Sequence, residues 1–254
     1  MKACVLASGS EGNVTYIETE KHKILLDIGM TVKYITEKLS ELSISPSDID
    51  HIFISHVHDD HVKALKQFIK KYHPTICVTP LILAELEILK GYDDILIYDD
   101  TVYLEDVKID IIKTSHDTTD SRGFVLESKG KSVVYLTDTG FINQKYFPKL
   151  NNKNVYLFES NHDIEMLLNG PYPKWLKDRV IGPEGHLSNK DSSIYLAKNI
   201  GPSTEKIVLM HLSHKNNTEE LALSTIREIF DEYDIPFNNI TCAKQREKSE
   251  LIIL

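Results

Sequence analysis

Short runs of β-branched and other apolar residues recur along the whole chain, and segments with helical periodicity separate several of them. The runs are MKACVLA, VTYIE, KILLDIG, HIFISH, ILIY, VKIDIIKTSH, GFVLES, SVVYLTD, VYLFES, KIVLMH and LIIL. They have the length and composition of β-strands. No internal repeat, low-complexity tract or long linker interrupts the alternation. The sequence therefore predicts a single α/β domain over residues 1–254.

Three segments show the spacing of amphipathic helices, and a fourth is marked by residues that favour a helix start and stop. Apolar side chains recur at steps of three and four in residues 61–73, where the lysines fall on the other face. The same spacing marks residues 32–42 and 221–230. Ser188 is a favourable N-cap, and Gly201 a favourable stop, for a fourth helix. The sequence thus predicts helices between several of the strands.

The composition narrows the class of protein. With 41% hydrophobic and 26% charged residues, the chain can bury a sizeable core and is not a disordered protein. Its formal net charge of -9 argues against coating nucleic acid or an anionic membrane by bulk charge. Cys4, Cys77 and Cys242 are widely spaced and form no CxxC pair, as expected of reduced thiols. Without a signal peptide or an apolar stretch of membrane-spanning length, the chain is expected to be soluble and cytoplasmic.

Ionisable residues stand at the ends of six predicted strands. In sheets covered by helices, sites form outside the carboxyl ends of the strands, so this placement is expected to gather distant residues at one edge. A random scatter of histidines would not follow the strand ends in this way. The six residues are Asp27, His56, His116, Asp138, Glu159 and His211.

Residues 55–61 read SHVHDDH and come directly after an apolar run. A solvated polar turn is one interpretation, because most short charged runs are only that. A metal site is the other, since His56 and His58 are two apart and point the same way in an extended chain. Asp60 and His61 then stand at the start of the following helix, turned toward a second position. Imidazole and carboxylate ligands without thiolates suit zinc, manganese or iron, and the place between a strand and a helix favours the metal site.

The motif SHVHDDH resembles the HxHxDH signature of the metallo-β-lactamase fold hydrolases, and Asp27 in LLDIG matches the supporting aspartate of that superfamily. The longer segments LASGSEGN, TDTG, ESNHDIEML, GPYP, GHLSN and HLSHKNN resemble the bacterial YycJ (WalJ) family. This resemblance covers nearly the whole chain. It implies a four-layer αββα sandwich with a centre for two divalent metal ions between the edges of two sheets.

The resemblance also implies a division of the ligands. The first ion would be held by His56, His58 and His116, the second by Asp60, His61 and His211, and Asp138 would bridge the two. Many true β-lactamases carry cysteine where this chain has Asp138, so the aspartate is against antibiotic hydrolysis and favours the phosphodiesterase branch. The histidine at position 58, in place of a glutamate, is against the flavodiiron oxidoreductases of the same fold. Zinc, manganese and iron all remain open as the metal.

The expected mechanism uses a metal-bridging hydroxide as the nucleophile, because two ions depress the pKa of bound water and neutralise phosphoryl charge. Asp60 is expected to orient this hydroxide. His186 in GHLSN resembles the general-acid histidine of related phosphodiesterases, and Glu159 would orient it and keep it protonated. A capping or core role is the alternative for His186. His162 is expected to be structural, and His214 departs from the arginine that the family more often shows.

The resemblance implies a metal-dependent phosphodiesterase that acts on DNA as a 5′ to 3′ exonuclease. The acidic net charge conflicts with this interpretation, so phosphate attraction would depend on the metals and a few local lysines. One alternative is a hydrolase of a small phosphodiester, a cyclic nucleotide or a thioester with the same chemistry. A second is a non-catalytic metal-binding scaffold. RNA processing is disfavoured, because the chain has no long inserted domain of the kind that RNA-cleaving relatives use to clamp their substrate.

Overall fold

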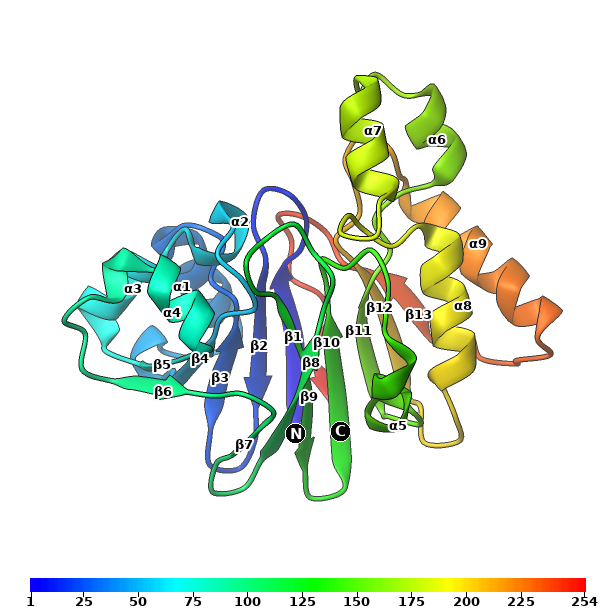
Figure 1. The fold of residues 1–254 in the computed structure, drawn as a ribbon. Helices are drawn as coiled ribbons and strands as arrows, with labels where there is room; N and C mark the ends of the chain where they lie inside the picture. Colours follow the sequence, from blue (N-terminus) through cyan, green and yellow to red (C-terminus); the bar gives the residue numbers. More distant parts are fainter.

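The computed structural model describes residues 1–254. Two mixed sheets of seven strands each pack face to face, and helices cover both outer faces (Figure 1). The prediction of an αββα sandwich is thereby confirmed. No helix is both long enough and apolar enough to cross a membrane.

The first sheet contains the N-terminal strands and the last strand of the chain. Its antiparallel part pairs β14, β1, β2 and β3, and its parallel part continues from β3 to β6. In spatial order the strands are β14 (Ile252–Ile253), β1 (Lys2–Ala7), β2 (Val14–Glu18), β3 (Lys23–Leu26), β4 (His51–Phe53), β5 (Thr75–Val78) and β6 (Ile95–Ile97). Parallel pairing makes β3 and β4 end at the same edge.

The second sheet contains the strands from the middle and the later part of the chain. The strands β10 to β13 run parallel, whereas β7, β8 and β9 are antiparallel to their neighbours. In spatial order they are β13 (Ile240–Cys242), β12 (Lys206–Met210), β11 (Val155–Glu159), β10 (Lys131–Leu136), β9 (Arg122–Ser128), β8 (Lys108–Lys113) and β7 (Thr101–Tyr103). Consequently β8, β10, β11 and β12 all point their carboxyl ends to one edge.

Helices flank each sheet, and one pair extends beyond the edge. Those beside the first sheet are α1 (Val32–Glu41), α2 (Asp59–Val62), α3 (Leu65–Tyr72) and α4 (Pro80–Glu85). Those after β10 are α5 (Phe147–Leu150), α6 (Ile164–Asn169), α7 (Lys174–Ile181), α8 (Asn189–Asn199) and α9 (Glu219–Glu232). Short 3-10 helices are η1 (Pro46–Asp48), η2 (Glu87–Leu89) and η3 (Gln144–Tyr146). Figure 1 shows α6 and α7 projecting above the upper edge of the second sheet.

Three apolar clusters fill the spaces between the four layers. The central cluster joins the inner faces of the two sheets, with Phe53 from one and Phe124 from the other at a ring distance of 5.6 Å. The cluster around Phe68 packs α1 and α3 on the first sheet, and the cluster around Phe230 packs α8 and α9 on the second. Apolar area removed from water stabilises a fold by about 25 cal/mol per Å². These clusters therefore hold the two sheets in a fixed position relative to each other.

The structure corrects the predicted helix over residues 61–73. Two helices, α2 and α3, occupy this stretch and are separated at Lys63 and Ala64. The amide of Ala64 donates to Ile28 O at 3.0 Å, and Asp60 O accepts from Asn13 N at 2.8 Å. These tertiary hydrogen bonds replace the bond from Ala64 N to Asp60 O that a continuous helix would need.

The other predicted elements differ from the structure in smaller ways. Ser188 is the N-cap of α8, and its Oγ accepts from Asp191 N at 3.0 Å as predicted. The helix ends at Asn199, two residues before the predicted stop at Gly201. The strands β5, β7 and β13 had no predicted counterpart. They are three or four residues long, too short for a clear periodicity.

Candidate metal centre

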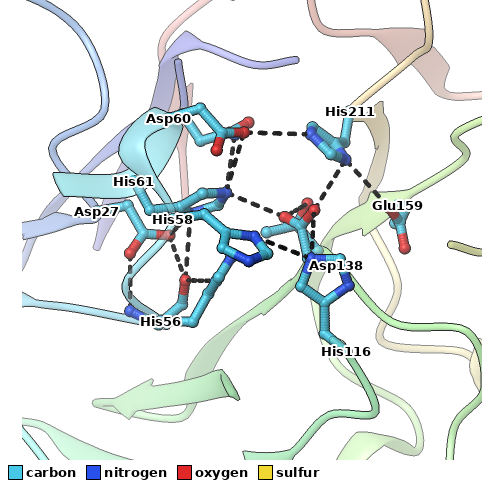
Figure 2. A network of polar contacts seen from close by, with 12 residues as sticks. Asp27, His56, His58, Asp60, His61, His116, Asp138, Glu159 and His211 are labelled. Atoms are coloured by element: carbon cyan, nitrogen blue, oxygen red, sulfur yellow. Dashed lines mark hydrogen bonds and ion pairs between the residues drawn. The ribbon is translucent and has the colours of Figure 1, made fainter. Parts of the chain in front are cut away.

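The predicted site residues meet where the carboxyl ends of strands from both sheets adjoin. Asp27 and His211 come directly after β3 and β12, and Asp138 follows β10 after one intervening residue. These three residues have φ values of 59°, 56° and 54°, in the left-handed region that non-glycine residues seldom adopt. Such backbone costs about 1–3 kcal/mol per residue and is concentrated at functional sites. Figure 2 shows the side chains converging from the two sheets.

The structure brings together the three histidines predicted to hold the first ion. One nitrogen from each of His56, His58 and His116 lies within 4.8 Å of the others. His58 is the N-cap residue of α2. The Nδ1 atom of His56 lies 3.0 Å from Ser55 Oγ, and that of His116 lies 3.2 Å from Gly185 O. These contacts leave Nε2 of both rings facing the cluster, and Nε2 of His56 is buried without any hydrogen-bond partner.

The three residues predicted to hold the second ion also come together. Ligand atoms of Asp60, His61 and His211 lie within 4.8 Å of one another. Asp60 and His61 belong to α2, whereas His211 comes from the end of β12 in the other sheet. Nε2 of His211 is buried without a hydrogen-bond partner and lies 3.8 Å from Asp60 Oδ2. The second set therefore spans the seam between the two sheets.

Asp138 lies between the two sets. Its Oδ2 is 3.1 Å from Nε2 of His61, and its Oδ1 is 3.8 Å from Nε2 of His116. Oδ1 is also 3.3 Å from Nδ1 of His211. The side chain is almost completely buried. Its carboxylate thus faces both sets, which is the position that a bridging ligand requires.

Asp27 supports the second set from behind. Its Oδ2 lies 2.8 Å from Nδ1 of His61 (Figure 2). The same oxygen accepts from Tyr135 Oη at 2.7 Å. Ser55 donates to the same carboxylate through both its backbone N and its Oγ. Because an ionised carboxylate only accepts, Nδ1 of His61 carries the proton and Nε2 faces the cluster. The sequence indicated Asp27, but nothing in it pointed to Tyr135.

Glu159 contacts two histidines with one oxygen. Its Oε1 lies 2.8 Å from Nδ1 of His186 and 3.1 Å from Nδ1 of His211. Its Oε2 accepts from the amides of Thr139 and Leu187. Burial alone would raise the pKa of Glu159, but the charge and hydrogen bond of His186 and the hydrogen bond of His211 lower this pKa to about 2. Sequence reasoning expected the contact with His186 and missed the one with His211.

The loop between β1 and β2 closes the cluster with polar side chains. Asn13 Nδ2 lies 3.0 Å from Nε2 of His61 and 3.3 Å from Asp60 Oδ2. Ser8 Oγ accepts from His211 N at 2.8 Å. The stretch SGSEGN, part of the segment LASGSEGN that carries the family resemblance, therefore contributes side chains to the site.

The donor set fits divalent cations. It offers imidazole nitrogens and carboxylate oxygens without thiolates, which suits zinc, manganese or iron. Two of its nitrogens, on His56 and His211, are buried and unpaired, and such atoms are costly unless a ligand satisfies them. Burial would lower the pKa of His211, but the carboxylates of Asp138, Asp60 and Glu159 raise it to about 10. The surroundings thus favour positive charge.

Three predicted residues lie outside the cluster. His162 is buried, and burial lowers its pKa to about 4; its backbone pairs with that of Ser188, which agrees with a structural role. His214 is exposed and lines a cavity of about 430 Å³. Asp59, which lies within the HxHxDH motif between two proposed ligands, is exposed.

Two cavities adjoin the cluster. One, of about 560 Å³, is lined by His58 and His116 together with the acidic residues Glu85, Asp117 and Glu184. The other, of about 620 Å³, adjoins Asp60 and includes Lys63, Arg246 and Tyr34. Each proposed ligand set is therefore reached through a polar cavity of its own.

The sequence profile of the metallo-beta-lactamase superfamily matches residues 8–211. The chain belongs to this superfamily. The exodeoxyribonuclease WalJ of Streptococcus pneumoniae is 36% identical over 232 residues, which cover 89% of this chain and 86% of the relative. The exodeoxyribonuclease YycJ of Bacillus anthracis is 31% identical over 233 residues, covering 90% and 88%. The predicted resemblance to the YycJ (WalJ) family is thus confirmed.

Comparison with solved structures agrees on the fold. The metallo-beta-lactamase fold protein YhfI from Bacillus subtilis superposes with a TM-score of 0.73, at 14% identity, over 98% of each chain. As a member of the metallo-beta-lactamase superfamily with relatives that are hydrolytic nucleases, the chain is a nuclease-like hydrolase, which confirms the predicted class of enzyme.

Proposed function

We propose that this protein is a metal-dependent exodeoxyribonuclease. One observation carries the proposal: the two sets of three candidate ligands, with Asp138 between them, lie beside a paired His186 and Glu159. This arrangement provides both halves of a phosphodiester hydrolysis, activation of the attacking water and protonation of the leaving oxygen. The identity of 36% to the exodeoxyribonuclease WalJ supports DNA as the substrate.

The proposed ligands divide as the sequence suggested. One ion would be held by His56, His58 and His116 and the other by Asp60, His61 and His211, and both would share Asp138. When bound, divalent ions lower the pKa of a coordinated water and neutralise charge on the attacked phosphoryl group. Asp60 is proposed to orient the attacking water through its second carboxylate oxygen, since Asn13 lies against Oδ2.

His186 is the proposed proton donor to the leaving oxygen. Its Nδ1 lies 2.8 Å from Oε1 of Glu159, and this contact fixes the orientation of the ring. The side chain keeps 18% of its surface exposed, and its ring lies 5.0 Å from that of His116 and 5.2 Å from that of His211. A proton on Nε2 can therefore reach an oxygen bound between the two sets.

The surroundings favour a polymer over a small closed ligand. Both cavities beside the cluster are open to solvent, whereas small-molecule sites bury most of the ligand surface. Lys63 and Arg246 line the cavity next to Asp60 and are proposed to contact the phosphate backbone. Because both sheets contribute ligands, the proposed catalytic unit is the whole of residues 1–254. A cytoplasmic location is supported by three free cysteines.

A digestion time course with end-labelled DNA tests the proposal. Duplex DNA labelled at the 5′ or the 3′ end is incubated with manganese-loaded protein, beside His58→Ala and a control His73→Asn at an exposed histidine. Early release of the 5′-terminal nucleotide, abolished only in His58→Ala, is the expected result. If the DNA stays intact while bis-p-nitrophenyl phosphate is hydrolysed, the exonuclease proposal is wrong and the protein is a hydrolase of small phosphodiesters. If neither substrate is cleaved while two metals are bound, the protein is a scaffold.

A further inference from the structure

Helix α7 is anchored at the candidate metal centre by its C-terminal end. Arg179 forms an ion pair with Asp117, which directly follows the candidate ligand His116. His186 N donates to Val180 O at 2.9 Å. From this anchor the helix extends outward above the edge where the site lies (Figure 1). The C-terminal end of α7 thus lies beside the cluster, and the rest of the helix leads away from it.

Trp175 is the only tryptophan of the chain, and it is 65% exposed on this helix. An indole ring left in water forgoes a large stabilisation, since aromatic side chains bury about 150–250 Å² each when they are packed. Trp175 precedes Arg179 by four residues, so the two side chains share one face of the helix. They are separated by one turn, about 6 Å along the axis. The ring thus lies one turn farther out than the ion pair at the metal centre.

The charged residues around α7 favour a base at the foot of the helix and a phosphate group farther out. At its foot, Glu85, Asp117 and Glu184 line the cavity next to His58 and His116. These carboxylates repel a phosphate group but accept hydrogen bonds from a neutral base. Farther out, the helix carries Lys174 and Lys177, in a chain with a net charge of -9. Arg179 belongs to the foot of the helix, where it pairs with Asp117.

We propose that Trp175 stacks on an unpaired base at the end of the DNA while the adjoining phosphate lies at the metal centre, and this rests on the proposed function. Aromatic platforms bind single strands in this way because every base has a π-face. The exposed Lys174 next to the ring supplies the attraction for the following phosphate. Stacking would hold the strand end in place without any preference for sequence.

The tryptophan fluorescence tests the proposal directly, because Trp175 is the only source. Wild-type protein with manganese is titrated with an oligothymidylate whose phosphorothioate linkages slow hydrolysis, and with an abasic oligonucleotide of the same length and charge. Saturable quenching by the first but not by the second is expected. Equal quenching by both, or DNA binding seen by anisotropy without any quenching, would overturn the inference and leave the exonuclease proposal intact.

Kinetics of Trp175→Ala and Trp175→Phe separate the two proposals. For single-stranded DNA, KM is expected to rise about 5-fold to 150-fold in Trp175→Ala, because stacking of a base is worth about 1–3 kcal/mol. Trp175→Phe should recover part of this loss, and hydrolysis of bis-p-nitrophenyl phosphate should stay unchanged in both variants. If the wild-type protein cleaves no DNA, the exonuclease proposal itself is refuted. A dimer that dissociates in Trp175→Ala, with KM unchanged, would assign the ring to a contact between two copies.

Discussion

The carboxylate of Asp27 lies 2.8 Å from Nδ1 of His61, and both side chains are completely shielded from solvent. This contact fixes the ring so that Nε2 faces Asp138 and Asp60. A supporting carboxylate of this kind sets the tautomer and the basicity of a histidine ligand. In the proposed centre, Asp27 would therefore support metal binding through His61, without facing the cluster itself.

Asp27→Asn is expected to weaken binding of the second metal about 10-fold to 100-fold. The introduced amide must keep its oxygen toward Ser55 N, so its NH₂ group faces Nδ1 of His61 and favours the wrong tautomer. Isothermal titration with zinc measures the two affinities. Tyr135→Phe is the matched control, because it removes one donor to Asp27 and leaves the contact with His61. If Tyr135→Phe weakens zinc binding as much as Asp27→Asn does, the tautomer argument is contradicted.

His186→Ala is expected to lower kcat for DNA about 10²-fold to 10⁴-fold, the usual contribution of a general acid. Metal content, measured by mass spectrometry of the purified protein, should remain at two ions, because His186 belongs to neither proposed ligand set. A substrate with a p-nitrophenolate leaving group needs little protonation and should be cleaved nearly as fast as by the wild type. Equal losses on both substrates would assign His186 to binding or packing.

Glu159→Gln is expected to impair both catalysis and metal retention. One oxygen of Glu159 serves His186 and His211, and the other accepts from Thr139 N at 2.9 Å. A glutamine cannot satisfy all these donors, because one of its two positions is an NH₂ group. The measurement compares kcat and metal content with those of His186→Ala. If metal content is unchanged in Glu159→Gln, the contact with His211 has no part in holding the metal.

Lys63→Ala and Arg246→Ala are each expected to reduce the salt dependence of DNA binding. Each phosphate contact contributes about -0.9 to the slope of log K against log salt for duplex DNA, and about -0.7 for single strands. Fluorescence anisotropy from about 50 to about 200 mM salt, the range over which such contacts lose much of their affinity, gives the slope. Lys198→Ala, at an exposed position of α8, is the control. Unchanged slopes in both variants would mean that the DNA phosphate backbone does not contact Lys63 or Arg246.

Removal of the metals is expected to destabilise the whole protein. Without cations, the carboxylates of Asp60 and Asp138 repel each other, and two buried histidine nitrogens stay unpaired. A metal present at about 100 times its dissociation constant stabilises the folded state by about 2.7 kcal/mol. Calorimetry with and without a chelator should therefore show a fall in Tm of several degrees. The same treatment of His58→Ala should give a smaller shift, and a shift of equal size would argue against His58 as a ligand.

The sequence predicted which residues gather in the cluster better than it predicted the local backbone. Strand-end placement indicated Asp27, His56 and His211 because strand periodicity and polar termination are local signals. The break between α2 and α3 depends on hydrogen bonds from Asn13 and to Ile28, far away in the chain. No local pattern carries that information. The same reason explains why the second contact of Glu159 appeared only in the folded protein.

The seam between the sheets has a consequence for synthesis of the chain. The proposed ligands beside the first sheet, ending at His61, are made early, but His211 and its strand β12 come after most of the second sheet has been synthesised. A nascent or truncated chain that stops before β12 lacks His211, one of the proposed partners of the second ion, and the strand that carries it. Complete metal loading would therefore report that the two sheets have docked. An unfinished chain would lack the proposed nuclease activity.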